Sequence, residues 1–205
     1  VSPSAIPFQE NWHVPQEMEL SDIERVKKQF ISASLKAVEI GFDLIEIHGT
    51  HGYLLHQFLS PISNKRKDKY GGNLENRMRF PLEIFSSLKS CLPKDFPIGM
   101  RITGAEWENN GIDENKATIL AKELEKIGRH YVCVSSGGNT PNPKIPLRPH
   151  YQVHLAKRIK KDTEMVVRTV GMIKDPFEAN NIVINKDADM VAMARAFLSN
   201  PRWVW

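Results

Sequence analysis

The stretch KAVEIGFDLIEIHGTHGY, residues 36–53, decides the fold class. Upstream of it, apolar residues recur at helical spacing over residues 23–40, and SDIE at Ser21–Glu24 predicts a capping box at the start of that helix. Gly41 predicts the end of the helix, and an apolar strand over 42–48 follows immediately. A helix joined to a strand by a single glycine is typical of α/β proteins.

The same alternation of helices and strands continues along the chain. Asp113 and Asp175 are the predicted N-caps of two further helices, and Gly128 predicts a helix end. The apolar patterns predict helices over 113–128, 150–161 and 175–184, and strands over 42–48, 97–103, 131–136, 165–171 and 189–195. The strand centres lie roughly 25 to 55 residues apart, which suits parallel βα units.

Two architectures are compatible with these strands, a doubly wound open sheet and a (β/α)8 barrel. A dinucleotide-binding doubly wound sheet usually carries a GxGxxG turn after its first strand. The chain has no such turn there, and SSGGN at 135–139 lacks the spacing. Polar residues instead follow the ends of successive strands, namely His48, Arg101, Ser135, Gly171 and Arg195. This distribution is typical of a barrel, whose catalytic residues come from the ends of several strands.

We therefore expect a partial (β/α)8 TIM barrel that contains about the last five βα units. Residues 1–205 are expected to form a single incomplete barrel domain, in which 1–20 are an opening loop and 21–205 are the βα units. The three further strands of a closed barrel are expected to precede Val1.

The composition is that of an ordinary globular protein, with 205 residues, 41% hydrophobic and 25% charged, and a net charge of +4. No apolar run approaches the ~20 residues needed to cross a bilayer, and there is no signal-peptide pattern, so we expect a soluble, cytoplasmic protein. Cys91 and Cys133 fit a reducing compartment. We interpret the densest basic segment, 64–72, as a solvated loop, and we expect neither nucleic acid nor a membrane as a partner.

His48, His51 and Tyr53 lie within six residues at the end of the first strand. The local pattern leaves three interpretations of the histidines open: a metal site, a pair of donors to one oxygen atom, or a structural role. A metal site needs a third protein ligand, and His56 is expected to point elsewhere. Tyr53 is a candidate proton donor beside the same oxygen, or it packs under the loop.

Arg101 is expected on the inward face of its strand. It either pairs with Glu46, because a buried charge needs a partner, or it faces an electron-rich cofactor such as a flavin. Residues at the last two strand ends can bind a phosphate, because glycine permits close backbone approach and arginine adds charge. These residues are Gly171, Ala194 and Arg195.

Taken together, these residues resemble the Old Yellow Enzyme family of FMN-dependent ene-reductases, and within it the bacterial branch that contains YqjM and xenobiotic reductase A. The resemblance covers nearly the whole chain, and its most specific block runs from Gly41 to Phe80. The motifs that carry it are PSAIPF, GFDLIEIHGTHGYLLHQFLSPISNKR, DKYGGNLENRMRFPLEI, VSSGGN, YQV, VGMI and ADMVAMARAFLSNPRW.

The resemblance implies an activity and the residues that perform it. NADPH or NADH would reduce FMN, and the reduced flavin would then pass a hydride to the activated C=C bond of an α,β-unsaturated carbonyl compound. His48 and His51 would bind the activating oxygen of that substrate rather than a metal. Tyr53 would lie over the same pocket as a candidate proton donor.

The resemblance also implies how the cofactor is bound. Arg101 would contact the flavin ring, and the FMN phosphate would be bound by Gly171, Ala194 and Arg195. We expect a homo-oligomer for the full-length protein, because in this branch the C-terminal tail can complete a neighbouring subunit's pocket. The chain departs from the family at Arg129 and His130, where a small residue and an acid are usual.

Other functions remain as alternatives. A related FMN barrel of the dihydroorotate dehydrogenase or dihydrouridine synthase type relies on a catalytic Cys or Ser near the flavin, and neither Cys91 nor Cys133 lies within 48–53. A metal-dependent barrel hydrolase is a further enzyme alternative. The isolated chain is alternatively a non-catalytic partial barrel, because five strands leave two sheet edges unpaired.

Overall fold

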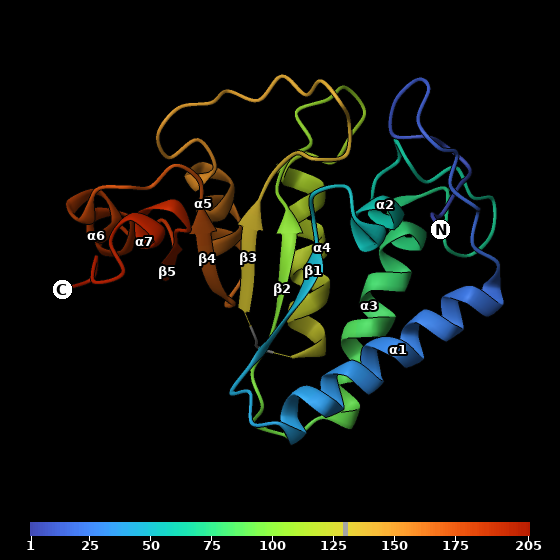
Figure 1. Ribbon diagram of the computed structural model, residues 1–205, viewed down its shortest axis with the longest axis horizontal. Helices are drawn as coiled ribbons and strands as arrows, with labels where there is room; N and C mark the ends of the chain where they lie inside the picture. The colour runs from blue at the N-terminus through green and yellow to red at the C-terminus, as the bar shows by residue number, and fades with distance from the viewer. Residues whose placement is uncertain (129–130) are drawn as a thin grey trace.

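The computed structural model describes residues 1–128 and 131–205, so that Arg129 and His130, the two departures from the family pattern, lie outside the described residues. The chain folds around one parallel sheet in the order β1-β2-β3-β4-β5 (Figure 1). Its strands are β1 (Ile45–Gly49), β2 (Ile98–Thr103), β3 (Tyr131–Ser135), β4 (Val166–Val170) and β5 (Met190–Ala192). The five predicted parallel strands are confirmed, but the last is shorter than predicted, since it ends at Ala192 and Arg195 begins a helix.

Helices connect successive strands and cover one face of the sheet, with α4 and α5 behind the strands in Figure 1. The described residues form α1 (Leu20–Glu39), α2 (Leu54–Leu59), α3 (Leu74–Cys91), α4 (Glu114–Ile127), α5 (Val153–Asp162), α6 (Pro176–Ile184) and α7 (Arg195–Ser199). Among the described residues, no helix is both long enough and apolar enough to cross a membrane.

Capping chemistry sets several of these helix ends. Asp113 accepts a hydrogen bond from the Lys116 amide at 2.9 Å, and Asp175 caps α6, as predicted. The capping box predicted at Ser21–Glu24 is wrong. The Asp22 side chain accepts from the Glu19 amide at 3.1 Å, and the helix begins at Leu20, because the Met18 amide pairs with the Ser2 carbonyl and keeps the chain extended up to that point.

Helix α3 was not predicted from periodicity, and it contains Pro81 in its interior. Proline normally interrupts a helix because it lacks an amide hydrogen. Here Phe80, Ile84 and Leu88 are fully buried against α1, α2 and α4, so tertiary packing outweighs the local cost of the proline.

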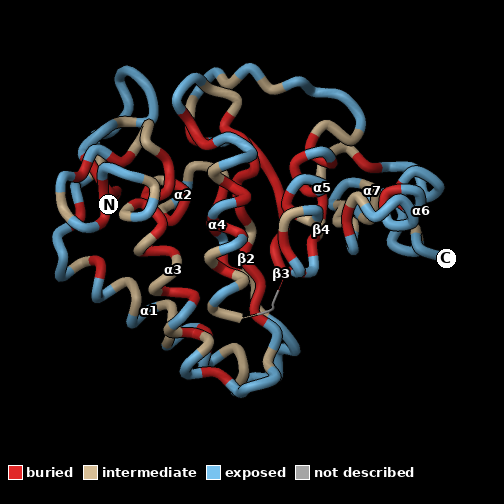
Figure 2. The backbone as a smooth tube through the Cα atoms, turned by 180° about the vertical axis from the view of Figure 1, so that it is seen from behind, coloured by how far each residue is buried: buried red, intermediate tan, exposed pale blue. Residues whose placement is uncertain are grey.

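The strands alternate between two faces. The helix-covered face carries the apolar core, which includes Ile47, Met100, Ile102, Val132, Val134 and Val167. Figure 2 shows that β2 and β3 are largely buried. The opposite face carries a polar row, because His48 is in register with Arg101, Arg101 with Cys133, and Cys133 with Arg168. The candidate site residues on the strands therefore share one face.

This polar face is concave. Glu46 on β1 forms an ion pair with Arg168 on β4, although β2 and β3 lie between them. In a flat sheet, strands three positions apart are about 14 Å from each other, and a sheet that curls around this face shortens the span that the two side chains must bridge. Gly99 permits the curl, because a Cβ there would overlap the ring of Tyr131. The predicted Glu46–Arg101 pair is wrong, since the curvature brings Arg168 to Glu46 instead.

The basic segment 64–72 has a structural role that was not predicted. Arg66 is buried and donates hydrogen bonds to the carbonyl of Pro3 at 3.1 Å and to that of Met18 at 2.6 Å. It also forms an ion pair with Asp68 at 2.6 Å. The interpretation as a solvated loop holds for Lys67 but not for Arg66, which joins the opening loop to the rest of the domain.

We predict that Arg66→Met lowers the free energy of unfolding by about 2–4 kcal/mol, because it leaves two buried carbonyls and one carboxylate without their donor. Lys67→Met is the matched control, since Lys67 is exposed on the same loop. The measurement is urea unfolding followed by circular dichroism. Equal midpoints for the two variants would contradict this role for Arg66.

Candidate active site

The turn between β1 and α2 has a strained backbone that two glycines make possible. His51 and Gly52 have φ values of 58° and 74°, both in the left-handed region. A Cβ on Gly52 would overlap the carbonyl oxygen of Gly138, and a Cβ on Gly138 would lie 2.6 Å from the Cα of His51. The turn and the loop after β3 are therefore in direct backbone contact, which fixes where the side chains of the turn project.

The structure brings the predicted substrate-binding residues together. The ring centroids of His48 and His51 are 5.4 Å apart, and those of His48 and Tyr53 are 5.2 Å apart. Tyr53 is 64% exposed, so its hydroxyl is accessible and the alternative that it packs under the loop is wrong. The Nε2 atom of His51 lies 2.8 Å from the Oγ atom of Ser135 on β3, which orients the imidazole.

Both histidines are neutral near pH 7. Burial, followed by the positive charge of Arg101, lowers the pKa of His51 to about 4. The same two causes, in the same order, lower the pKa of His48. The pair therefore offers imidazole hydrogen-bonding groups without a fixed positive charge, and the nearest cation is Arg101.

A cavity of about 640 Å³ extends from this turn along the carboxyl ends of β2 to β5. Predicted residues from four segments line it, namely His51, Arg101, Gly171, Ala194 and Arg195. His48 and Tyr53 are not among its lining residues. The ring of His48 lies next to that of His51, and the ring of Tyr53 lies next to that of His48. One cavity thus joins the predicted cofactor residues to His51, and His48 and Tyr53 lie beside it.

The cavity residues fit a flavin mononucleotide. Arg101 is partly buried in the concave face and lines the cavity, so its guanidinium can donate to a heterocyclic ring. At the far end, Gly171 has a φ of 118°, and a Cβ there would lie 2.5 Å from the Nε2 atom of Gln152. Arg195 and Lys174 supply positive charge at that end, which suits a phosphate.

Gln152 is a site-organising residue that sequence reasoning missed. It is buried, accepts a hydrogen bond from the Ser136 hydroxyl at 2.6 Å, and donates to the Val170 carbonyl at 3.2 Å. The Ser135 hydroxyl lies 3.3 Å from the same Gln152 oxygen and 2.8 Å from the Nε2 atom of His51, and when its one proton goes to His51, the Nδ1 atom of the neutral imidazole carries the proton that can be donated to a ligand. Gln152 therefore links the ends of β3 and β4 to the histidine turn. The only signal for it in the sequence was its place in the YQV motif of the resemblance.

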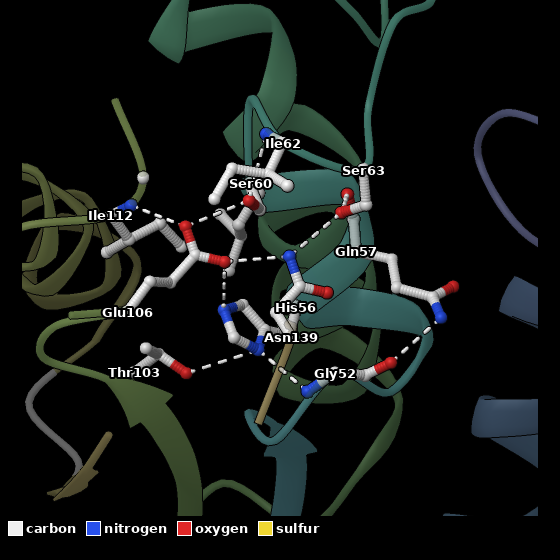
Figure 3. A network of polar contacts seen from close by, with 12 residues as sticks. Gly52, His56, Gln57, Ser60, Ile62, Ser63, Thr103, Glu106, Ile112 and Asn139 are labelled. Atoms are coloured by element: carbon white, nitrogen blue, oxygen red, sulfur yellow. Dashed lines mark hydrogen bonds and ion pairs between the residues drawn. The ribbon is translucent and has the colours of Figure 1, made fainter. Parts of the chain in front are cut away.

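A second network lies beneath the turn (Figure 3). His56 is fully buried and is not among the residues that line the cavity, as predicted. Its Nδ1 atom accepts from the Gly52 amide at 2.8 Å, and its Nε2 atom lies 3.1 Å from the Oε1 atom of Glu106. Burial acts to raise the pKa of Glu106, but hydrogen bonds from His56, Ile112 and Ser60 outweigh burial and hold that pKa below its ordinary value. Glu106 was not predicted as a site residue.

The metal interpretation lacks its third ligand in the part of the chain that the structure describes. Within residues 1–128 and 131–205, no three His, Cys, Asp or Glu side chains are grouped so that they can bind a metal ion. The two remaining interpretations are an oxygen-binding pair and a structural role. The exposure of His48 and the position of His51 on the cavity favour oxygen binding.

Comparison with known proteins assigns the chain to a family. The model of the NADH:flavin oxidoreductase / NADH oxidase family matches residues 1–205. The chain belongs to this family. The resemblance to Old Yellow Enzymes is thereby confirmed, and family membership implies FMN and NAD(P)H as the cofactors.

Named relatives support the same assignment. The chain is 40% identical over 203 residues to an NADPH dehydrogenase of Geobacillus sp. (strain WCH70), covering 99% of this chain and 59% of that protein. It is 39% identical over 208 residues to an NADH oxidase of Thermoanaerobacter brockii, covering 99% of this chain and 32% of that protein. The chain therefore spans well under two thirds of the length of these relatives.

Solved structures of larger oxidoreductases share the fold. A 2-naphthoyl-CoA reductase in complex with 2-naphthoyl-CoA superposes with a TM-score of 0.91 at 28% identity, covering 98% of this chain and 31% of that one. A morphinone reductase variant in complex with tetrahydroNAD superposes with a TM-score of 0.80 at 25% identity, covering 99% of this chain and 57% of that one. The curved five-stranded sheet is thus a partial TIM barrel, as predicted.

We predict that His51 titrates with a midpoint near pH 4 in the folded protein and near its ordinary ~6.5 in urea. Between these values the unfolded chain binds a proton that folded His51 does not, so this residue's contribution to stability falls as the pH is lowered through that window. The measurement is the histidine Cε1 proton shift by NMR.

Arg101→Gln tests the electrostatic cause of this shift. Removing the guanidinium charge should raise the pKa of His51 while leaving it below the ordinary value, because burial is the larger cause. A midpoint near 6.5 in the folded wild-type protein, or one unchanged by Arg101→Gln, would contradict the assignment.

Proposed function

We propose that the protein is an FMN-dependent NAD(P)H oxidoreductase, an ene-reductase that reduces the activated C=C bond of α,β-unsaturated carbonyl compounds. The observation that carries the proposal is the pair of neutral imidazoles, His48 and His51, beside the exposed Tyr53. They lie at the edge of the cavity, whose cations Lys174 and Arg195 are at the far end. Family membership supports the flavin and the nicotinamide nucleotide.

His48 and His51 bind the carbonyl oxygen of the substrate. Hydrogen bonds to this oxygen draw electron density from the conjugated alkene and make its β-carbon a better hydride acceptor. Because both rings are neutral, their hydrogen bonds strengthen as negative charge develops on the oxygen, without a full ion pair in the ground state. Ser135 and the Gly52–Gly138 contact keep His51 in place during this change.

Tyr53 supplies the proton. In the net reaction, a hydride that originates from NAD(P)H reaches the β-carbon of the alkene, and a proton reaches the α-carbon. Tyr53 lies beside His48 and its side chain is exposed, so the phenol can deliver its proton and regain one from solvent.

The concave face binds the cofactor in this proposal. Arg101 would contact the flavin ring with its guanidinium, and Gly171, Ala194 and Arg195 would bind the phosphate. Bound FMN supplies the hydride-transfer chemistry that no amino-acid side chain can provide. The protein supplies orientation and charge around it.

The alternative is a chain that binds no flavin on its own. The described sheet ends at β1 and β5, and large apolar side chains such as Phe42 and Leu198 are 60% and 82% exposed. Such a surface favours further packing over solvation. The homo-oligomer and the absence of nucleic-acid and membrane partners stay predictions.

We predict that His48→Ala and His51→Ala each lower kcat for 2-cyclohexenone reduction by about 10²-fold, because each removes one donor to the reacting oxygen. His13→Ala is the control, since His13 is exposed in the opening loop. The measurement is NADPH oxidation under anaerobic conditions with saturating FMN. An undiminished rate in both variants would refute the role of the pair.

A further inference from the structure

We infer that His56 and Glu106, which do not line the cavity, are positioning residues that fix the orientation of the His51–Tyr53 turn. The inference rests on the proposed function, because the turn it describes is the one that binds the substrate oxygen. The contacts that carry it form a closed ring, in which His56, Glu106 and Asn139 are buried.

The first contact fixes the tautomer of His56. The backbone amide of Gly52 has only a proton to offer, so the Nδ1 atom, 2.8 Å away, must be the acceptor. A neutral His56 then carries its proton on Nε2, which lies 3.1 Å from the Glu106 carboxylate. The imidazole thus links the carboxylate to the backbone of the turn, so that the position of the carboxylate determines that of the turn.

Glu106 is itself fixed by a donor from its own loop and by donors from two other segments. Its carboxylate accepts from the Ser60 hydroxyl at 2.9 Å, from the Ile112 amide at 2.5 Å and from the Asn139 side chain at 2.7 Å. The residue is only 1% exposed, and a buried carboxylate with this many donors cannot move without losing one of them. It is therefore a rigid reference point at the end of α2 and beside the loop after β3 (Figure 3).

The ring closes through the backbone. Asn139 follows Gly138, which is in direct contact with the turn at Gly52 and His51. A shift of the turn must therefore break the Gly52–His56 hydrogen bond or separate the two loops. Displacements of about 1 Å at a reacting group can lower a rate by about 10²-fold, so such a ring has a direct catalytic consequence.

Two near-isosteric variants distinguish the role of the Nδ1 atom of His56 from that of its Nε2 atom. The side-chain oxygen of Asn in His56→Asn can take the place of Nδ1, which keeps the acceptor for Gly52 and loses the contact with Glu106. The amide of Gln in His56→Gln can take the place of Nε2, which keeps the donor to Glu106 and loses the acceptor for Gly52. Each variant removes one of the two buried polar contacts of His56, so a purely structural role predicts similar effects for the two.

The inference predicts different effects. Hydrogen–deuterium exchange of the Gly52 amide, followed by NMR, should stay slow in His56→Asn and become at least about 10-fold faster in His56→Gln. With FMN bound, kcat for 2-cyclohexenone should fall about 10-fold or more in His56→Gln, with a smaller change in KM, and should fall less in His56→Asn, which loses the anchor at Glu106 but keeps the bond to Gly52. Equal exchange rates and equal kcat values in the two variants would overturn the inference.

Two further results keep the test decisive. In the wild-type protein, the nitrogen shifts of His56 should show an unprotonated Nδ1 and a protonated Nε2, and a protonated Nδ1 would overturn the inference without any variant. If the wild-type protein reduces no enone, the proposed function fails, whereas the Gly52 exchange rates still decide whether His56 positions the turn.

Discussion

The ion pair between Glu46 and Arg168 crosses two intervening strands, and it lies on the curved face of the sheet that also carries His48 and Arg101. Curvature converts a row of strand residues into the wall of a cavity, so that Arg101 on β2 and Arg195 after β5 border one space. Gly99 permits this curvature because it has no side chain beneath the ring of Tyr131, and helices cover the opposite face of the sheet.

Neutral and positively charged side chains occupy different parts of the cavity. Burial and Arg101 keep His48 and His51 neutral, while Arg101 and Arg195 place positive charge where a flavin ring and a phosphate would lie. Neutral donors suit an oxygen that gains charge only during the reaction, whereas cations suit a group that is anionic throughout. Buried anchors such as Glu106 and Gln152 hold the loops that carry these groups.

Local features were predictable from the sequence, and contacts between distant segments were not. Asp113 and Asp175 cap helices through neighbouring amides, and His48, His51 and Tyr53 follow one strand, so their sequence neighbours were sufficient. The Glu46–Arg168 pair depends on curvature, and α3 depends on packing that outweighs Pro81. The His56–Glu106 contact joins residues 50 positions apart with no spacing rule to predict it.

The most direct test of the central claim, that His48 and His51 stabilise negative charge on a ligand oxygen, is the ionisation of bound 4-nitrophenol, followed by its absorbance in the FMN-loaded protein. The account predicts that the phenol ionises at a lower pH when bound than when free, because two preorganised donors favour the phenolate. It also predicts that the double variant His48→Ala/His51→Ala abolishes the shift. Binding of the neutral phenol, or an undiminished shift in the double variant, would contradict the account.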